Sequence, residues 1–167
     1  MATDLQIASG SPATAEADAV VFGVLPGGDD GPVRLAPGAD ELDAAFDGEL
    51  AALLTVAGAT GKAEEVVKLP TRGAVRAALL VAVGLGKPGG DGGPGAEQVR
   101  RAAGAAARAL AGTARAASTL GRLDLAAAAE GTLLGAYTFT AYRSGNGSAR
   151  KDPVGSMALL GVDADDA

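Results

Sequence analysis

Two glycine-rich turns carry the residue patterns of this sequence that come nearest to a ligand-binding motif. Residues 84–89 spell Gly-x-Gly-x-x-Gly directly after an apolar run. In dinucleotide-binding folds such a turn opens at once into a helix, whose first amides bind the pyrophosphate. Here Pro88, Pro94 and further glycines delay the next helical pattern. We therefore interpret residues 86–95 as a mobile surface loop, with a nucleotide-binding loop as the alternative.

The second turn, residues 58–63, resembles the phosphate-binding loop of nucleotide hydrolases. That loop needs an early glycine and, after its lysine, a hydroxyl that holds Mg²⁺. Val56 stands in place of the glycine and Ala63 in place of the hydroxyl, so we reject this interpretation. Asp29 and Asp30 are adjacent carboxylates on a flexible turn. Two such groups fall far short of a calcium loop, and we predict a solvated turn.

The composition excludes several classes of chemistry. Cysteine and histidine are absent, so there is no disulfide, no thiol or imidazole catalysis and no zinc site built from the usual ligands. A metal site would need carboxylates, carbonyls or lysine. No carboxylate pair, hydroxyl nucleophile or ligand cluster stands out in the 167 residues. We assign no catalytic, cofactor-binding or metal-ligating residue and expect no cofactor in this chain.

Charge and hydropathy indicate the kind of partner and the compartment. The chain has 20 acidic and 14 basic residues, a net charge of −6, which disfavours binding to nucleic acid. The first residues lack the basic and apolar regions of a signal peptide, and no segment offers about 18 uninterrupted apolar residues. We expect a soluble cytoplasmic protein with no membrane contact.

Residues 123–143 are the segment with the strongest helical pattern. Asp124 is a candidate N-cap, and Arg143 lies where a helix C-terminus favours positive charge. Gly131 and Gly135 are four apart, which leaves a groove on one face for a neighbouring backbone. Because apolar residues recur on two faces, we predict a buried helix. The two stripes are Leu123, Ala126, Leu133, Leu134, Tyr137 and Ala141, and Leu125, Ala128, Ala129, Ala136, Phe139 and Tyr142.

Glu130 and the arginines that follow Glu97 are charged residues for which we predict ion pairs or hydrogen bonds. Glu130 lies in the helix predicted to be buried, so we expect it to bond to a nearby Arg or to backbone amides. Arg101, Arg108 and Arg115 recur every seven residues and give the segment from Glu97 a basic face. We interpret this face as solvated, with an i,i+4 pair between Glu97 and Arg101, and keep contact with a partner domain as the alternative.

The order of apolar runs and turns predicts the fold. Runs apolar on both faces, residues 17–25 and 77–85, are typical of central strands. Further strands are predicted at residues 4–8, 33–35, 65–69, 116–120 and 155–162, and helices at 40–54, interrupted near Gly48, and at 97–110. Strands that alternate with helices favour one α/β domain, a three-layer α/β/α sandwich with a mixed sheet flanked by helices.

Four segments together resemble the N-terminal domain of the leucyl aminopeptidases, the cytosol aminopeptidases of the M17 family. They are residues 17–24, 58–62, 79–86 and 129–143. The last is the most specific, with Glu-Gly-x-x-Leu-Gly-x-Tyr-x-Phe-x-x-Tyr-Arg at residues 130–143. The resemblance covers nearly the whole chain. It implies a macro-domain-like fold over residues 1–162, with residues 163–167 as the start of an interdomain linker.

The same resemblance implies where the chemistry of such an enzyme resides. The family holds two divalent metals, Mn or Zn, in a following catalytic domain, in segments similar to Val-Gly-Lys-Gly-x-x-Phe-Asp and Asn-Thr-Asp-Ala-Glu-Gly-Arg. Neither segment occurs here, so no family metal or catalytic residue is carried onto this chain. The resemblance implies an inactive piece that contributes scaffold, with its own catalytic domain and a homohexamer as partners. DNA binding, known for some bacterial members, conflicts with the acidic balance.

A macro-like fold raises a second function, binding of ADP-ribose or a related nucleotide. Residues 18–21 resemble the start of the macro-domain Asp-x-Ile-Val-Asn-Ala strand. Phe22 and Gly23, however, replace the Asn-Ala that follows, and the phosphate loop of that family is not recognisable. Fold analogy alone supports this alternative.

Overall fold

The computed structural model describes residues 2–90, 93–137 and 151–161. Within them the chain forms one sheet in the order β1-β7-β6-β2-β5-β4, with β3 paired to β2 off this path. The strands are β1 (Asp4–Ala8), β2 (Ala19–Leu25), β3 (Arg34–Leu35), β4 (Val66–Pro70), β5 (Leu79–Gly84), β6 (Arg115–Ser118) and β7 (Ser156–Leu160). Each predicted strand is confirmed, with ends shifted by a few residues.

The sheet is mixed and mostly parallel. Strand β2 lies parallel to both β5 and β6, with Val21 opposite Val81 and Val20 opposite Ala117. Strands β6, β7 and β1 continue in the same direction, whereas β3 and β4 run antiparallel to their neighbours. All residues of β2 are buried, as its continuous apolar run predicts for a central strand covered on both faces.

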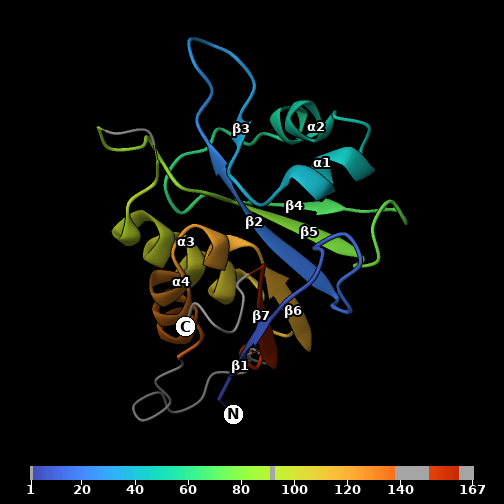
Figure 1. Cartoon of the computed structure of the whole chain (residues 1–167), viewed down its shortest axis with the longest axis vertical. Helices are drawn as coiled ribbons and strands as arrows, with labels where there is room; N and C mark the ends of the chain where they lie inside the picture. Colours follow the sequence, from blue (N-terminus) through green and yellow to red (C-terminus); the bar gives the residue numbers. More distant parts are fainter. Residues whose placement is uncertain (1, 91–92, 138–150, 162–167) are drawn as a thin grey trace, which may run out of the picture.

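Helices cover both faces of this sheet (Figure 1). They are α1 (Asp40–Ala45), α2 (Leu50–Val56), α3 (Ala96–Ala109) and α4 (Leu125–Ala136), with a 3₁₀ turn, η1 (Leu120–Arg122), before α4. The break predicted near Gly48 separates α1 from α2, and Gly48 adopts a φ of 77° that favours glycine. No helix in the described ranges is long and apolar enough to cross a membrane.

Two apolar cores result, one on each side of the sheet. Ala19 and Val21 of β2 share a core with α3 and α4, and Val20, Phe22 and Val24 share the other with α1 and α2. Val99, Ala103, Ala106 and Leu110, which recur at helical spacing along and just after α3, are all buried. The three-layer sandwich predicted from the sequence is therefore confirmed. On α2, Leu50 and Leu54 are buried, whereas Leu53 is 42% exposed.

Helix α4 is shorter and less buried than predicted. It ends at Ala136, and Tyr137 is extended, with a ψ of 119°, so the predicted helix to Arg143 is wrong as a continuous element. Phe139, Tyr142 and Arg143 themselves lie outside the described residues.

The burial predicted for α4 is wrong on one face. Leu133, Leu134 and Tyr137 of the first predicted stripe are 47%, 69% and 71% exposed. Burial falls on the opposite side of the helix, on Ala127, Ala128, Gly131, Thr132, Gly135 and Ala136. In this chain α4 is thus an outer-layer helix with an apolar outward face.

Candidate functional site

The carboxyl ends of the parallel strands are where an open α/β sheet binds ligands, at the point where the chain reverses its direction of winding. Here β2 marks that point, because the chain moves to β5 on one side and to β6 on the other. A ligand site of this kind would therefore lie between the loops that leave β2 and β5.

Protein backbone fills the space between these two loops. A Cβ on Gly84 would lie 1.8 Å from the carbonyl oxygen of Lys62, and one on Gly61 would lie 2.4 Å from the nitrogen of Pro26. The Gly86 amide donates to the Gly61 carbonyl at 3.0 Å. Glycine is needed here because two chain segments touch, which explains the Gly-x-Gly pattern without a nucleotide.

The loop after β5 is tied to helix α3 by one side chain. Gln98 accepts a hydrogen bond from the Gly95 amide at 2.9 Å and donates to the carbonyls of Leu85 and Lys87, both at 2.8 Å. Helix α3 begins at Ala96, well after the glycine turn, as the prolines predict. Gly86, predicted to open a surface loop, is buried.

The turn that resembles a phosphate-binding loop binds the carboxylate of Glu65, a residue of the same chain. The amides of Thr60 and Gly61 donate to Glu65 Oε2 at 2.8 and 3.0 Å. The Thr60 hydroxyl donates to the other carboxylate oxygen at 2.9 Å. Glu65 thus occupies the position that a phosphate would need, which agrees with the rejection of that motif.

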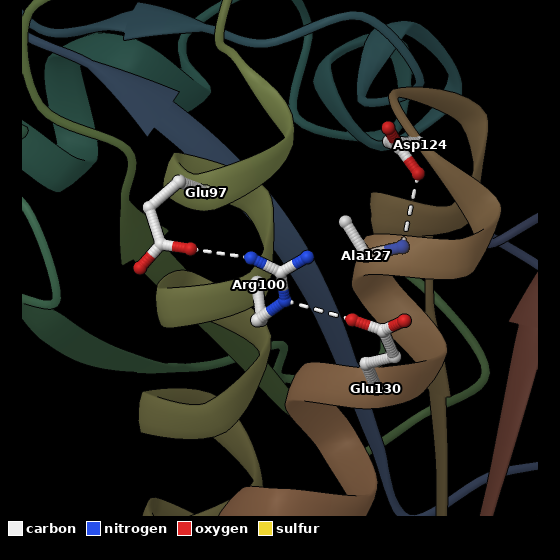
Figure 2. Close-up of polar contacts among 5 residues, drawn as sticks. All are labelled: Glu97, Arg100, Asp124, Ala127 and Glu130. Carbon is white, nitrogen blue, oxygen red and sulfur yellow. Dashed lines mark hydrogen bonds and ion pairs between the residues drawn. The ribbon is translucent and has the colours of Figure 1, made fainter.

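The best-organised polar cluster joins α3 to α4 (Figure 2). Arg100 Nε donates to Glu130 Oε2 at 2.8 Å, and Arg100 also pairs with Glu97. The bonds to Glu130 and Glu97 raise the pKa of the Arg100 guanidinium above its ordinary high value. The predicted bond between Glu130 and an Arg is confirmed, but the Glu130 side chain is 58% exposed and not buried.

The basic face of α3 pairs with carboxylates from elsewhere. Arg101 Nη2 lies 2.7 Å from Glu64 Oε2, and Arg108 Nη2 lies 3.4 Å from Glu64 Oε1. The predicted Glu97–Arg101 pair is therefore wrong, because Glu97 pairs with Arg100 three residues on. Arg115, predicted to extend this face, begins β6 instead.

Helices α3 and α4 approach each other closely at their glycines. A Cβ on Gly131 would lie 2.1 Å from the Arg100 carbonyl oxygen, and one on Gly135 would lie 2.3 Å from that of Gly104. The groove predicted from their spacing is confirmed, and α3 fills it. At the other end of α4, Asp124 Oδ1 accepts a hydrogen bond from the Ala127 amide at 2.9 Å, which confirms the predicted N-cap (Figure 2).

Sequence reasoning did not predict two open hollows, one at the amino-terminal ends of β2, β5 and β6 and one along β1 and β7 under the loop that follows β1. The first, about 360 Å³, is lined by Glu16, Asp18, Arg76 and Arg115 among others. Arg76 pairs with Glu16 at 2.7 Å, and Asp18 accepts from the Arg115 amide at 3.0 Å. The second, about 310 Å³, lies beside it. Their residues are spread along the chain and share no motif, so the sequence carries no signal for them.

Among the residues described, no group of three or more Asp and Glu side chains is placed to hold a metal ion. The described residues therefore suggest no metal ligand, and none was assigned from the sequence. The hydrogen bonds and ion pairs of Gln98, Glu65, Arg100 and Glu64 all join parts of this domain to one another.

Comparison with known proteins decides the family. The sequence profile of the cytosol aminopeptidase family, N-terminal domain, matches residues 21–146. The chain belongs to this family. The resemblance seen in the sequence is thereby confirmed.

Curated relatives of the family extend well beyond the chain. A probable cytosol aminopeptidase of Streptomyces griseus is 46% identical over 175 residues, covering 96% of this chain and 34% of the relative. A probable cytosol aminopeptidase of Nocardia farcinica is 44% identical over 156 residues, covering 90% of this chain and 30% of the relative. The chain thus spans about a third of the length of these relatives.

Solved structures share the fold. A tomato leucine aminopeptidase variant matches with a TM-score of 0.64 and 19% identity, over 96% of this chain and 33% of that one. The bottromycin maturation enzyme BotP in complex with Mn matches with a TM-score of 0.58 and 24% identity, over 90% of this chain and 28% of that one. At these identities the match concerns the fold alone.

Proposed function

We propose that this chain is the non-catalytic N-terminal domain of a bacterial leucyl aminopeptidase, a cytoplasmic metal-dependent enzyme that removes N-terminal residues from peptides. The observation that carries the proposal is the 46% identity to a probable cytosol aminopeptidase across 96% of the chain. Residues 1–162 form the domain in this proposal, and residues 163–167 begin the linker to a catalytic domain.

The proposed role of this domain is scaffolding. In the full enzyme, two divalent metals, Mn or Zn, held by the catalytic domain would polarise the scissile carbonyl and activate water. The Mn complex of BotP is in keeping with such a metal requirement. This domain would position the catalytic domain and contribute to assembly of a homohexamer. Its contacts support a rigid body suited to that task, because apolar cores hold both helix layers to the sheet and α3 and α4 pack closely at their glycines.

A paired activity assay tests the proposal. The 167-residue protein and a polypeptide that continues through the following reading frame are each incubated with leucine p-nitroanilide and Mn²⁺. We expect turnover only from the longer protein. Light scattering should show that the longer protein is a hexamer. Turnover by the 167-residue protein, or an inactive longer protein, would contradict the proposal.

Calorimetry with ADP-ribose separates this function from the nucleotide-binding alternative. Backbone from Gly61 to Ala63 lies against Gly84 and Gly86, at the edge of the sheet where a nucleotide would bind. We therefore expect no heat of binding. Micromolar affinity would overturn the scaffold proposal in favour of a macro-like binding module.

A further inference from the structure

The outward face of α4 is unusual for a surface helix because it is mostly apolar. Its exposed residues, Ala126, Glu130, Leu133, Leu134 and Tyr137, recur at helical spacing. The single charged group among them, Glu130, is paired with Arg100 of the neighbouring helix. A helix that faces water normally carries polar residues along this side. The face is therefore suited to contact with another apolar surface.

The exposed area indicates what kind of partner this face can hold. At 47%, 69% and 71% exposure, Leu133, Leu134 and Tyr137 together offer on the order of 400 Å². A stable complex between separate molecules buries about 800 Å² on each partner. Domains joined in one chain pack through smaller interfaces, because the tether keeps the effective concentration in the millimolar range. The patch therefore fits a tethered domain better than a second copy.

The path of the chain places such a domain close to this face. The last described residue, Gly161, bonds through its amide to the Ala8 carbonyl at 3.1 Å. A Cβ on Gly161 would lie 1.9 Å from Arg122 Nε, in the η1 turn that leads into α4. The described chain thus ends beside the Arg122 side chain of η1, the turn that directly precedes α4. The helix has 12 residues, about 18 Å, a length that about six extended residues span.

We propose that, in the full-length protein, the polypeptide that follows this domain packs on the outward face of α4 through Leu133, Leu134 and Tyr137. The inference rests on the proposed function, because it requires a catalytic domain after this one. It goes beyond that function in assigning the residues through which the two domains meet.

Cysteine labelling tests the proposal, because the chain contains no cysteine of its own. The variant Leu134→Cys is prepared in the 167-residue protein and in the longer polypeptide, with any cysteine of the added portion replaced by serine. The matched control is Val56→Cys, which lies on α2 across the sheet and is 88% exposed. Reaction with a maleimide is followed under native conditions, after circular dichroism has shown that both variants fold.

In the 167-residue protein we expect both thiols to react rapidly and at rates independent of protein concentration. In the longer protein, the labelling rate of Leu134→Cys should fall to about one tenth or below, which corresponds to a docked fraction of about 90% or more. The labelling rate of Val56→Cys should be the same in both proteins. Equal rates for Leu134→Cys in the two proteins would refute the proposal. Slow labelling of Leu134→Cys already in the 167-residue protein would also refute it. If that rate depended on protein concentration, a second copy would cover the face; if it did not, another part of this chain would.

The activity of the longer protein, measured alongside, keeps the two proposals apart. If the longer protein is inactive but its Leu134→Cys thiol is protected, the docking proposal stands and the aminopeptidase proposal is contradicted. If the longer protein is active but its Leu134→Cys thiol labels freely, the aminopeptidase proposal stands and the docking proposal is refuted.

Discussion

Replacing Gly131 by alanine should loosen the contact between α3 and α4 and destabilise the domain. The added Cβ would lie 2.1 Å from the Arg100 carbonyl oxygen and 3.0 Å from the Ala103 side chain. A carbon and a carbonyl oxygen ordinarily approach to about 3.3 Å. The two helices must therefore separate by roughly 1 Å, and neither obstacle is the flexible end of a long side chain.

Two opposing effects set the size of this change. Inserting a methyl group into a packed interface costs about 1–3 kcal/mol, and the rigid backbone obstacle places Gly131→Ala at the upper end. Alanine recovers about 1 kcal/mol because it is a better helix former than glycine. The net loss in the free energy of unfolding should be about 2 kcal/mol. For a domain of this size that corresponds to a fall in Tm of about 4–8 °C.

Thermal unfolding followed by circular dichroism measures the effect across a graded series. Gly135→Ala, with a Cβ 2.3 Å from a carbonyl oxygen, should behave like Gly131→Ala, whereas Gly104→Ala, at 3.2 Å, should cost less. Gly28→Ala is the control, because a Cβ there meets nothing within 4 Å, and its Tm should hardly change. Helix propensity alone would raise the Tm of all the helical variants. A stabilised Gly131→Ala protein would therefore refute the close-approach argument.

Substitutions test three further contacts. Asp124→Ala removes the N-cap of α4 and should cost about 1 kcal/mol in chemical denaturation, whereas Asp29→Ala on a solvated turn should not change stability. Glu65→Ala leaves two turn amides without their acceptor and should cost about 1–2 kcal/mol; an unchanged denaturation midpoint would show that water replaces the carboxylate without loss. A double-mutant cycle with Arg100→Gln and Glu130→Gln should give a small coupling that vanishes in 1 M salt, because both groups are partly exposed. Since the pKa of Arg100 is raised, its contribution is complete below the ordinary arginine pKa and is lost only in strong alkali, so the effect of Arg100→Gln should not vary with pH across the neutral range.

The sheet and its layers could be predicted from the sequence because their signals are local. Residues 17–25 and 77–85 are continuous apolar runs bounded by turns, a pattern that a strand buried on both faces requires. Asp124 and the glycine pair at Gly131 and Gly135 were predicted from spacing along one helix. In each case the determining residues lie within one element, so the pattern is visible without knowing the fold.

The contacts that sequence reasoning missed depend on residues far apart in the chain. Glu64, just before β4, lies 37 and 44 positions from Arg101 and Arg108 of α3, and the fold brings them together because α3 packs against β4. The burial of α4 was overestimated for a different reason. A helix apolar all round needs two partners, and its sequence does not say whether both belong to the same domain.

The position of β1 has a consequence for how the chain folds. The Thr3 hydroxyl bonds to the Val154 carbonyl at 2.7 Å across 151 positions, and within the described residues β1 pairs only with β7. At 5–20 residues per second on the ribosome, β1 is made about 7–30 s before β7, its partner. Long-range pairs also form slowly, because closing a long loop costs entropy before any contact repays it. We expect β2 and β5 to associate early and the first residues of the chain to join the sheet last.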